Sequence, residues 1–221
     1  LLFKYIKNYM RFVFLFFLLS CANIVPPSGG PVDTSAPILL SLEPKNNATK
    51  FQDDFIKLFF DENVIIKNNN NIYTSPDFDL IKKIKSNGKE VLVQLKKPLQ
   101  KNKTYVIDFN NSIEDLNEGN TLGGLKYVFS TGETIDSAVI SGEVVDFEYN
   151  EPVQNGLVGL YQGDVTGFFD SIISQTKPDF ITLTNKEGKY DYSNLKSGLY
   201  TLFCIKDENL NLKYEPSEMV S

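Results

Sequence analysis

The residue types that could carry out chemistry are unevenly represented in this chain. Its 221 residues include 28 Asp and Glu, 22 Lys and Arg and two Cys, but no His. Without His, the chain lacks the commonest general base, the Ser-His-Asp and Cys-His catalytic arrangements, and imidazole metal ligands. The single Arg is Arg11, and the pI is near 4.8. Because nucleic acids are bound mainly by clustered Lys and Arg, this composition argues against a nucleic-acid partner.

One acidic segment has the ligand spacing of an EF-hand calcium loop, with oxygen side chains at positions 1, 3, 5, 9 and 12 and a backbone carbonyl at position 7. Position 6, where the sharp turn requires Gly, is Leu212, and no helical pattern flanks the segment. Two interpretations stay open, a calcium site and a polar loop that follows a strand. No other cofactor is expected. The candidate ligands are Asp207, Asn209, Asn211, Glu215 and Glu218.

Two Asp-Ser-apolar triplets resemble the acceptor sites of periplasmic O-glycosylation in some bacteria. They place candidate glycosylated hydroxyls at Ser137 and Ser171. A three-residue pattern also arises easily by chance, so the alternative is an unmodified pair of serines.

Aromatic residues gather near Gly163 and Gly167, where Tyr161 is followed by Phe168 and Phe169. On a loop of a β-sandwich, such side chains can stack on sugars or bind a protein partner. In the alternative interpretation, Phe168 and Phe169 cap the hydrophobic core.

The N-terminus has a basic start, a short apolar run and a small residue before a Cys, which is the pattern of a secretory signal. The apolar run has eight residues, whereas about 20 are needed to span the hydrocarbon layer. The segment therefore predicts a cleaved signal and not a membrane-spanning helix. Its parts are Lys4, Lys7 and Arg11, then residues 12–19, then Ser20 and Cys21.

Residues 18–21 closely resemble a bacterial lipobox, which implies cleavage between Ser20 and Cys21 and acylation of Cys21. The alternative is a buried apolar helix with a chance Cys. Two or three acyl chains anchor a protein durably, at about 0.8 kcal/mol per buried CH₂. Loss of the three basic residues takes the formal charge from −6 to −9, and an acidic body is repelled by anionic lipid. Because no acidic residue directly follows Cys21, we expect the outer membrane, on its periplasmic face.

The other cysteine, Cys204, lies in the apolar run of residues 200–205. With Cys21 acylated, no intramolecular disulfide can form, and Cys204 is expected to be a small core residue without a nucleophilic role. Residues 21–36 contain the lipidated Cys and a tether rich in Pro and Gly, which predicts an extended spacer.

After the tether, short runs of alternating apolar and polar residues predict β-strands, and no long helical period occurs. The chain is 42% hydrophobic and 13% aromatic, which fits a globular all-β protein. Turn residues such as Asn87 and Gly88 separate the strands. The predicted strands are 38–43, 55–61, 64–67, 79–85, 90–95, 104–110 and 125–131, followed by 139–146, 157–161, 180–184, 189–192 and 199–206.

Residues 37–133 resemble the bacterial Ig-like domain of S-layer proteins, which implies a β-sandwich. Asp115 and Asn120 suit a tight turn in which their side chains bind nearby backbone. The alternative is a metal site formed by Glu114, Asp115 and Glu118. The resemblance rests on Pro37-Ile38, Pro44, Asn47 and residues 56–64, 99–105, 113–120 and 127–132.

Residues 137–221 resemble the prealbumin-like sandwich of carboxypeptidase regulatory domains and collagen-adhesin B-repeats. Gly188 and Gly198 are expected at turns that need a positive φ. The chain ends soon after the last recognisable strand, so the expectation includes a unit that is incomplete at its C-terminal end. The motifs are Ile140-Ser141-Gly142-Glu143-Val144, residues 158–161, residues 184–190 and residues 195–200.

The predicted architecture is therefore all-β, with a signal peptide over 1–20, a lipidated tether over 21–36 and two tandem β-sandwiches over 37–133 and 137–221. This layout resembles that of a family of envelope lipoproteins, and the resemblance implies no catalytic residue in this chain. We expect a non-catalytic protein, lipid-anchored in the cell envelope, that contacts an unidentified envelope protein or glycan. The alternative is a carbohydrate-binding accessory lipoprotein of a glycan-uptake system. A concave face with exposed Tyr or Phe favours the second, and a flat acidic face favours protein contact.

Overall fold

The computed structural model describes residues 30–77, 79–165 and 176–206. Within them the backbone forms fifteen β-strands and one 3-10 helix, with no α-helix, and no helix there is long and apolar enough to cross a membrane. Thr34–Ser221 form one compact unit. Its strands fall into two groups with separate cores, the first sandwich with β1–β10 and the second with β11–β15. The predicted all-β architecture is confirmed.

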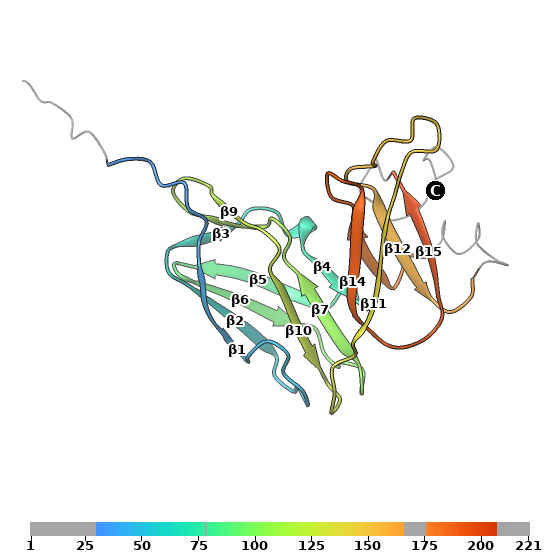
Figure 1. Cartoon of the computed structure of the whole chain (residues 1–221). Helices are drawn as coiled ribbons and strands as arrows, with labels where there is room; N and C mark the ends of the chain where they lie inside the picture. The colour runs from blue at the N-terminus through green and yellow to red at the C-terminus, as the bar shows by residue number, and fades with distance from the viewer. Residues whose placement is uncertain (1–29, 78, 166–175, 207–221) are drawn as a thin grey trace, which may run out of the picture. The chain divides into compact units, whose positions relative to one another are not determined.

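The first sandwich consists of two larger antiparallel sheets and a small third one (Figure 1). One larger sheet has the strand order β1-β2-β6-β5, the other has the order β10-β7-β4, and the small sheet has the order β3-β8-β9. The strands are β1 (Leu39–Glu43), β2 (Phe55–Phe60), β3 (Val64–Ile66), β4 (Tyr73–Ser75), β5 (Ile81–Asn87), β6 (Glu90–Leu95), β7 (Thr104–Asp108), β8 (Ile113–Asp115), β9 (Thr121–Leu122) and β10 (Lys126–Ser130), and the 3-10 helix η2 spans Asn69–Asn71.

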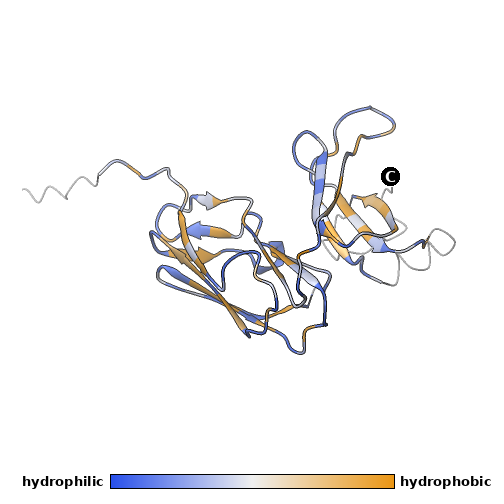
Figure 2. Ribbon diagram, turned by 60° about the horizontal axis from the view of Figure 1, so that its bottom comes forward, coloured by the Kyte–Doolittle hydropathy of each residue, from blue (hydrophilic) through white to orange (hydrophobic). Residues whose placement is uncertain are grey.

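The core of the first sandwich follows the two-residue period of its strands, which Figure 2 shows as alternating apolar and polar segments. Along β6, Val91, Val93 and Leu95 are buried, whereas Leu92 and Gln94 lie half-buried on the opposite face. The predicted alternation is confirmed. The corresponding core residues of β7, β10 and the position after β7 are Tyr105, Ile107, Phe109, Tyr127 and Phe129.

Phe129 is the centre of an aromatic cluster in this core. Its ring centroid lies 4.1 Å from that of Phe51, 5.1 Å from that of Tyr105 and 5.9 Å from that of Tyr127. The buried Tyr127 hydroxyl donates a hydrogen bond to the Pro44 carbonyl at 3.0 Å, which satisfies its polar end. Burial of each such side chain contributes roughly 1.5–3 kcal/mol, so this cluster stabilises the core of the first sandwich.

The second sandwich pairs a two-stranded sheet, β11-β14, with a three-stranded sheet of order β13-β12-β15. Val158 and Leu160 of β12 pack in one core cluster with Tyr192, whereas Leu157 and Tyr161 pack in another with Phe203. Both faces of the three-stranded sheet are therefore buried, which explains the continuous apolar sequence of β12. The strands are β11 (Ala138–Glu143), β12 (Leu157–Gln162), β13 (Phe180–Leu183), β14 (Lys189–Leu195) and β15 (Tyr200–Ile205).

Every predicted strand has a counterpart in the structure, and three short strands were not predicted. These are β4, β8 and β9, which have two or three residues each. A strand of two or three residues displays little of a two-residue period. β3, which also has three residues, is predicted because Val64, Ile65 and Ile66 are all apolar and β-branched, a signal that β4, β8 and β9 lack.

Gly188 has the predicted positive φ, +72°, but the same expectation for Gly198 is wrong. The positive φ in this part of the chain falls on Asn194, at 61°, within β14. There the pairing of β14 with β11 shifts between Ala138 and Ile140, so the chain needs its left-handed residue at a bulge and not at the following turn.

Candidate functional site

The loop between β11 and β12 is tightly ordered by one aspartate. The Asp146 carboxylate accepts hydrogen bonds from the backbone N–H of Glu148 and of Tyr149, both at 2.9 Å. The backbone of Asp146 also accepts from Asn150 N–H at 2.8 Å and donates to the Glu151 carbonyl at 2.8 Å. Asn150 takes the left-handed conformation, φ 53°, that Asn tolerates in tight turns. These bonds fix the backbone of residues 146–151, which we name the aromatic loop.

The aromatic loop presents two large aromatic side chains to solvent. Phe147 is completely exposed and Tyr149 is 70% exposed. Val145, directly before the loop, is 41% exposed. The bonds of Asp146 hold the backbone that carries these rings, so their exposure is a property of an ordered turn. An ordered, exposed aromatic pair is typical of a recognition surface.

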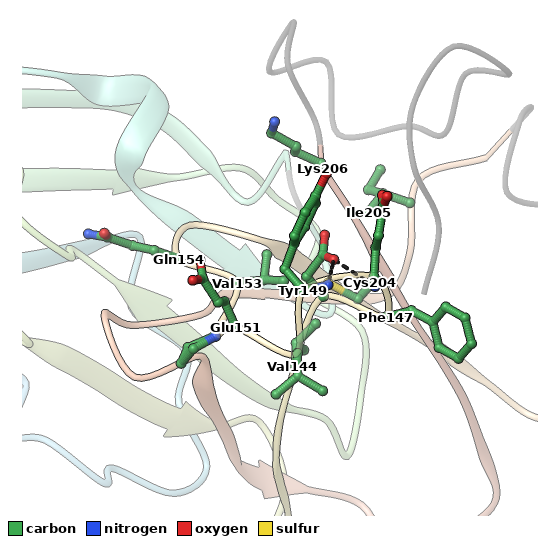
Figure 3. A pocket seen from close by; sticks show the side chains of 13 residues that line it. Val144, Phe147, Tyr149, Glu151, Val153, Gln154, Cys204, Ile205 and Lys206 are labelled. Atoms are coloured by element: carbon green, nitrogen blue, oxygen red, sulfur yellow. Dashed lines mark hydrogen bonds between the residues drawn. The ribbon is translucent and has the colours of Figure 1, made fainter.

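Beside the aromatic loop lies a cavity of about 440 Å³. Its wall is apolar at Val153, Cys204 and Ile205, and it carries the acidic side chains of the loop. Figure 3 shows the Phe147 ring pointing outward, away from the other labelled side chains. The volume is within the range of small-molecule pockets. The lining residues are Val144–Pro152 except Asn150, together with Val153, Gln154, Cys204, Ile205 and Lys206.

The chemistry of this cavity suits binding. Cys204 is a free thiol, 4% exposed, and burial raises its pKa to about 11, so it is protonated at neutral pH. This confirms the prediction of a buried core cysteine. The Asp146 carboxylate is engaged by backbone N–H groups. Among the lining residues that the structure describes, no nucleophile stands beside a base.

The acidic residues at β8 form the predicted tight turn. One oxygen of Asp115 accepts from the N–H groups of Asn117, Glu118 and Gly119 at 2.6–3.0 Å, and the other accepts from Asn120 N–H at 2.8 Å. Burial opposes ionisation of this carboxyl, but these backbone hydrogen bonds outweigh it and lower its pKa.

The alternative metal site at this turn is not supported. Glu114 accepts from the Lys67 ammonium at 2.9 Å and from the Thr121 hydroxyl at 3.2 Å, and the Asp115 oxygens are engaged by the turn. In the part of the chain that the structure describes, no three His, Cys, Asp or Glu side chains are placed to hold a metal ion.

Several predicted site residues lie outside the described residues: Ser20, Cys21, Ser171 and the calcium candidates Asp207, Asn209, Asn211, Glu215 and Glu218, together with Phe168 and Phe169. Ser137 is exposed directly before β11.

Tyr161 is not an exposed aromatic of a binding loop. It is 5% exposed, its ring lies 5.5 Å from that of Phe203, and its hydroxyl donates to the Thr176 carbonyl at 2.7 Å. It lies on β12, whose two faces are both covered. The nearby Gly163 suggested that Tyr161 belongs to an exposed loop, but Tyr161 is part of the core.

The exposed aromatics beside this cavity are Phe147 and Tyr149, which the sequence analysis did not single out. Their signal was an alternation of acidic and aromatic residues, Asp146 to Glu151, that continues the period of β11 up to Pro152. The sequence predicts a strand over 139–146 and a turn that Pro152 closes, but it does not show which side chains of that turn are exposed. The hydrogen bonds of Asp146 fix the conformation of the turn.

Comparison with known proteins finds a match for the first sandwich. Residues 33–131 match the family model described as the bacterial Ig-like domain. The first sandwich is therefore similar to a bacterial Ig-like domain. The aromatic loop lies outside the matched residues. No curated protein matches the sequence.

Two solved structures share a distant likeness with the chain. The N-terminal part of the bacterial S-layer protein SbsC matches 76% of this chain at 11% identity, with a TM-score of 0.33. BcpA, the major pilin subunit of Bacillus cereus, matches 83% of this chain at 9% identity, with a TM-score of 0.24. The chain spans 42% of the first structure and 65% of the second.

Proposed function

We propose that this chain is a non-catalytic envelope lipoprotein, anchored by acylated Cys21, whose β-sandwiches contact a protein or glycan of the cell envelope. The anchor rests on the basic, apolar and lipobox-like order of residues 4–21. The Ig-like domain supports a contact role, because such domains of bacterial surface proteins are typically non-catalytic.

The observation that carries the contact role is the aromatic loop. Large exposed aromatic side chains bury 150–250 Å² each when a partner covers them, and they lose little conformational freedom in doing so. Phe147 and Tyr149 stand on a backbone that the bonds of Asp146 already hold in place. A partner therefore meets a preorganised surface, which lowers the entropic cost of binding.

The second candidate is a carbohydrate-binding accessory role in a glycan-uptake system. It is favoured by the cavity of about 440 Å³ beside Tyr149, because a concave site with an exposed aromatic ring and polar neighbours suits a sugar. Glu148, Glu151 and Gln154 line the same cavity and supply hydrogen-bond acceptors for sugar hydroxyls.

Metabolic labelling with a palmitate analogue tests the anchor. We expect the wild-type protein to incorporate label and to fractionate with membranes, and the Cys21→Ala variant to do neither. The matched control is Cys204→Ala, which removes the other thiol and should label normally. An unlabelled wild type, or an equally labelled Cys21→Ala variant, would overturn the lipoprotein assignment.

Protease digestion of intact cells tests the expected location. The protein should stay intact if it faces the periplasm.

The contact role is tested with a panel of glycans and with crosslinking to envelope proteins. Phe147→Ala and Tyr149→Ala should each weaken the interaction and leave the melting temperature unchanged, because both side chains are exposed. Leu199→Ala is the matched control, since Leu199 is 65% exposed in the same sandwich but lies away from the loop in sequence. Glycan binding without crosslinks selects the second candidate. Turnover in a hydrolase screen would contradict the non-catalytic assignment.

A further inference from the structure

The outer face of the β1-β2-β6-β5 sheet carries an unusual set of side chains. The register of the sheet brings Lys85 of β5, Leu92 of β6 and Lys57 of β2 into one row across the strands. Because Leu58, Val91 and Val93 face the core, this row lies on the opposite face of the sheet. The face is thus built from lysines with apolar residues between them.

A second row on the same face repeats this composition. Lys83 pairs with Gln94, which pairs with Phe55, and Phe55 is 41% exposed. Lys83 and Lys85 are two residues apart on an edge strand, so their side chains leave the same face about 6.8 Å apart. The register of β5 shifts between Ile81 and Lys83, which adds the exposed Lys82 to the cluster.

These lysines have no acidic partners within the described residues. None of them makes an ion pair or a side-chain hydrogen bond there, whereas Lys96 and Lys97 nearby are paired with Asp79 and Asp54 at 3.4 and 3.6 Å. Glu43 lies directly across from Lys57 on β1, and Glu43, Asp53 and Asp54 line a cavity together with Lys57 and Phe55. On the strands of the face, the four lysines outnumber the two glutamates, Glu43 and Glu90. We name the four unpaired lysines, Lys57, Lys82, Lys83 and Lys85, the lysine face.

The lysine face stands out against the charge of the whole chain. The formal net charge is −6, yet this one sheet face has an excess of positive charge. It is hollowed at one end, where a cavity of about 490 Å³ is lined by Lys82, Lys96 and Lys97 and by one carboxylate, that of Asp54, together with Gln94 and Leu95. A local positive field on an acidic protein attracts a polyanion and orients it toward this face.

We propose that the lysine face binds an acidic polysaccharide, with its ammonium groups on the carboxylates of the sugar chain and with Phe55 and Leu92 against the apolar faces of the sugar rings. This inference deepens the glycan-contact role proposed above, on which it rests, but it uses a different surface from the aromatic loop. An extended sheet face of four strands fits a linear chain, since neighbouring strands continue the surface every 4.7–4.9 Å or so.

The composition of the face distinguishes this ligand from two others. Protein interfaces are depleted in Lys and enriched in Arg and aromatic residues, whereas this face has four Lys and no Arg. An anionic bilayer would have to approach a chain whose net charge is negative. A flexible polyanion avoids both difficulties, because it contacts the basic face alone.

Titration of the full chain with sodium alginate at low ionic strength tests the proposal. We expect saturable binding that weakens as salt is added, and no binding to neutral dextran. Lys83→Gln combined with Lys85→Gln should weaken alginate binding about tenfold, because two exposed ion pairs are lost. The matched control is Lys186→Gln combined with Lys189→Gln, which makes the same charge change on exposed residues of the second sandwich and should bind like the wild type.

Each alternative result is informative. Absence of alginate binding, or equal weakening in both double variants, would overturn the proposal, the second because it would mean a response to bulk charge. Binding of phosphatidylglycerol vesicles through Lys83 and Lys85 without alginate binding would assign the face to lipid instead. Phe147→Ala combined with Tyr149→Ala should keep alginate binding, so failure at the aromatic loop and failure at the lysine face are distinguishable. Unchanged melting temperatures verify that all variants fold.

Discussion

The Asp115 carboxylate stabilises the turn that follows β8 with both of its oxygens. Its two oxygens accept four backbone N–H groups from the turn that follows β8. The sequence around it, with Glu114 and Glu118, also has the composition of a metal site. The hydrogen bonds distinguish a structural turn from a metal site. A carboxylate that already accepts hydrogen bonds from four N–H groups has few lone pairs left to coordinate a cation.

The lowered pKa of Asp115 predicts how the stability of the first sandwich depends on pH. A carboxyl with a lowered folded-state pKa stabilises the fold above its unfolded value, near 3.8, and loses this contribution as the pH falls toward its folded value. The melting temperature should therefore fall below about pH 4. Asp115→Asn should melt several degrees lower at neutral pH and show a smaller acid-induced fall, as measured by circular dichroism.

Glu187→Gln is the control for this prediction, because Glu187 is an exposed acidic residue of the second sandwich. It should reproduce the wild-type melting temperature at every pH. An Asp115→Asn protein that melts like the wild type at pH 7 would show that the charged turn contributes nothing to stability.

At the scale of the element, the strands occur where apolar and polar residues alternate, and the turns occur where a residue can adopt a positive φ. Among the described residues, six Asn and five Gly take a positive φ. The Asn residues, with φ between 43° and 62°, are Asn47, Asn102, Asn110, Asn150, Asn155 and Asn194. Asn tolerates the left-handed region because its short side chain can hydrogen-bond locally. Left-handed positions therefore cannot be predicted from Gly alone. Near the end of β14, for example, the positive φ falls on Asn194 and not on Gly198.

Gly188 and Gly198 form a matched pair for testing this point. An added Cβ at Gly188, where φ is +72°, would lie 2.5 Å from the Val144 carbonyl oxygen. Gly188→Ala should therefore lower the free energy of unfolding by about 1–3 kcal/mol. At Gly198 no atom lies within 4 Å of the added Cβ, and Gly198→Ala should change it by less than about 0.5 kcal/mol. Urea denaturation of both variants measures the difference, and equal effects would refute the assignment of the turn.

At the scale of the whole molecule, the proposed anchor and the acidic charge act together. Removal of residues 1–20 would leave a chain of formal charge −9 on a Pro- and Gly-rich tether. Under this proposal, such a body would be held at the membrane by its acyl chains and repelled from anionic headgroups. The tether would then give both the aromatic loop and the lysine face access to partners beyond the bilayer surface.

The number of reactive thiols tests the processed state of the whole chain. In the native protein Cys204 should not react with a thiol reagent at pH 8, because it is buried and its pKa is raised to about 11. After unfolding, the acylated protein should show one thiol and unprocessed protein two. Cys204→Ala is the control and should reduce the unfolded, acylated count to zero. Two thiols in membrane-extracted protein would contradict acylation of Cys21.

The sequence by itself determined the all-β architecture, the faces of β6 and β7, the turn at Asp115 and the buried state of Cys204. Each of these depends on local period or local side-chain chemistry, which neighbours in the chain express directly. Only the tertiary structure decided the rest. It buried Tyr161 by covering both faces of its strand, and it exposed Phe147 and Tyr149 by closing a turn on Asp146. It also gathered Lys57 and Lys85 from strands 28 residues apart onto one face. Exposure and cross-strand neighbours depend on which strands pair, and that pairing is set by the core of the folded chain and not by any single segment.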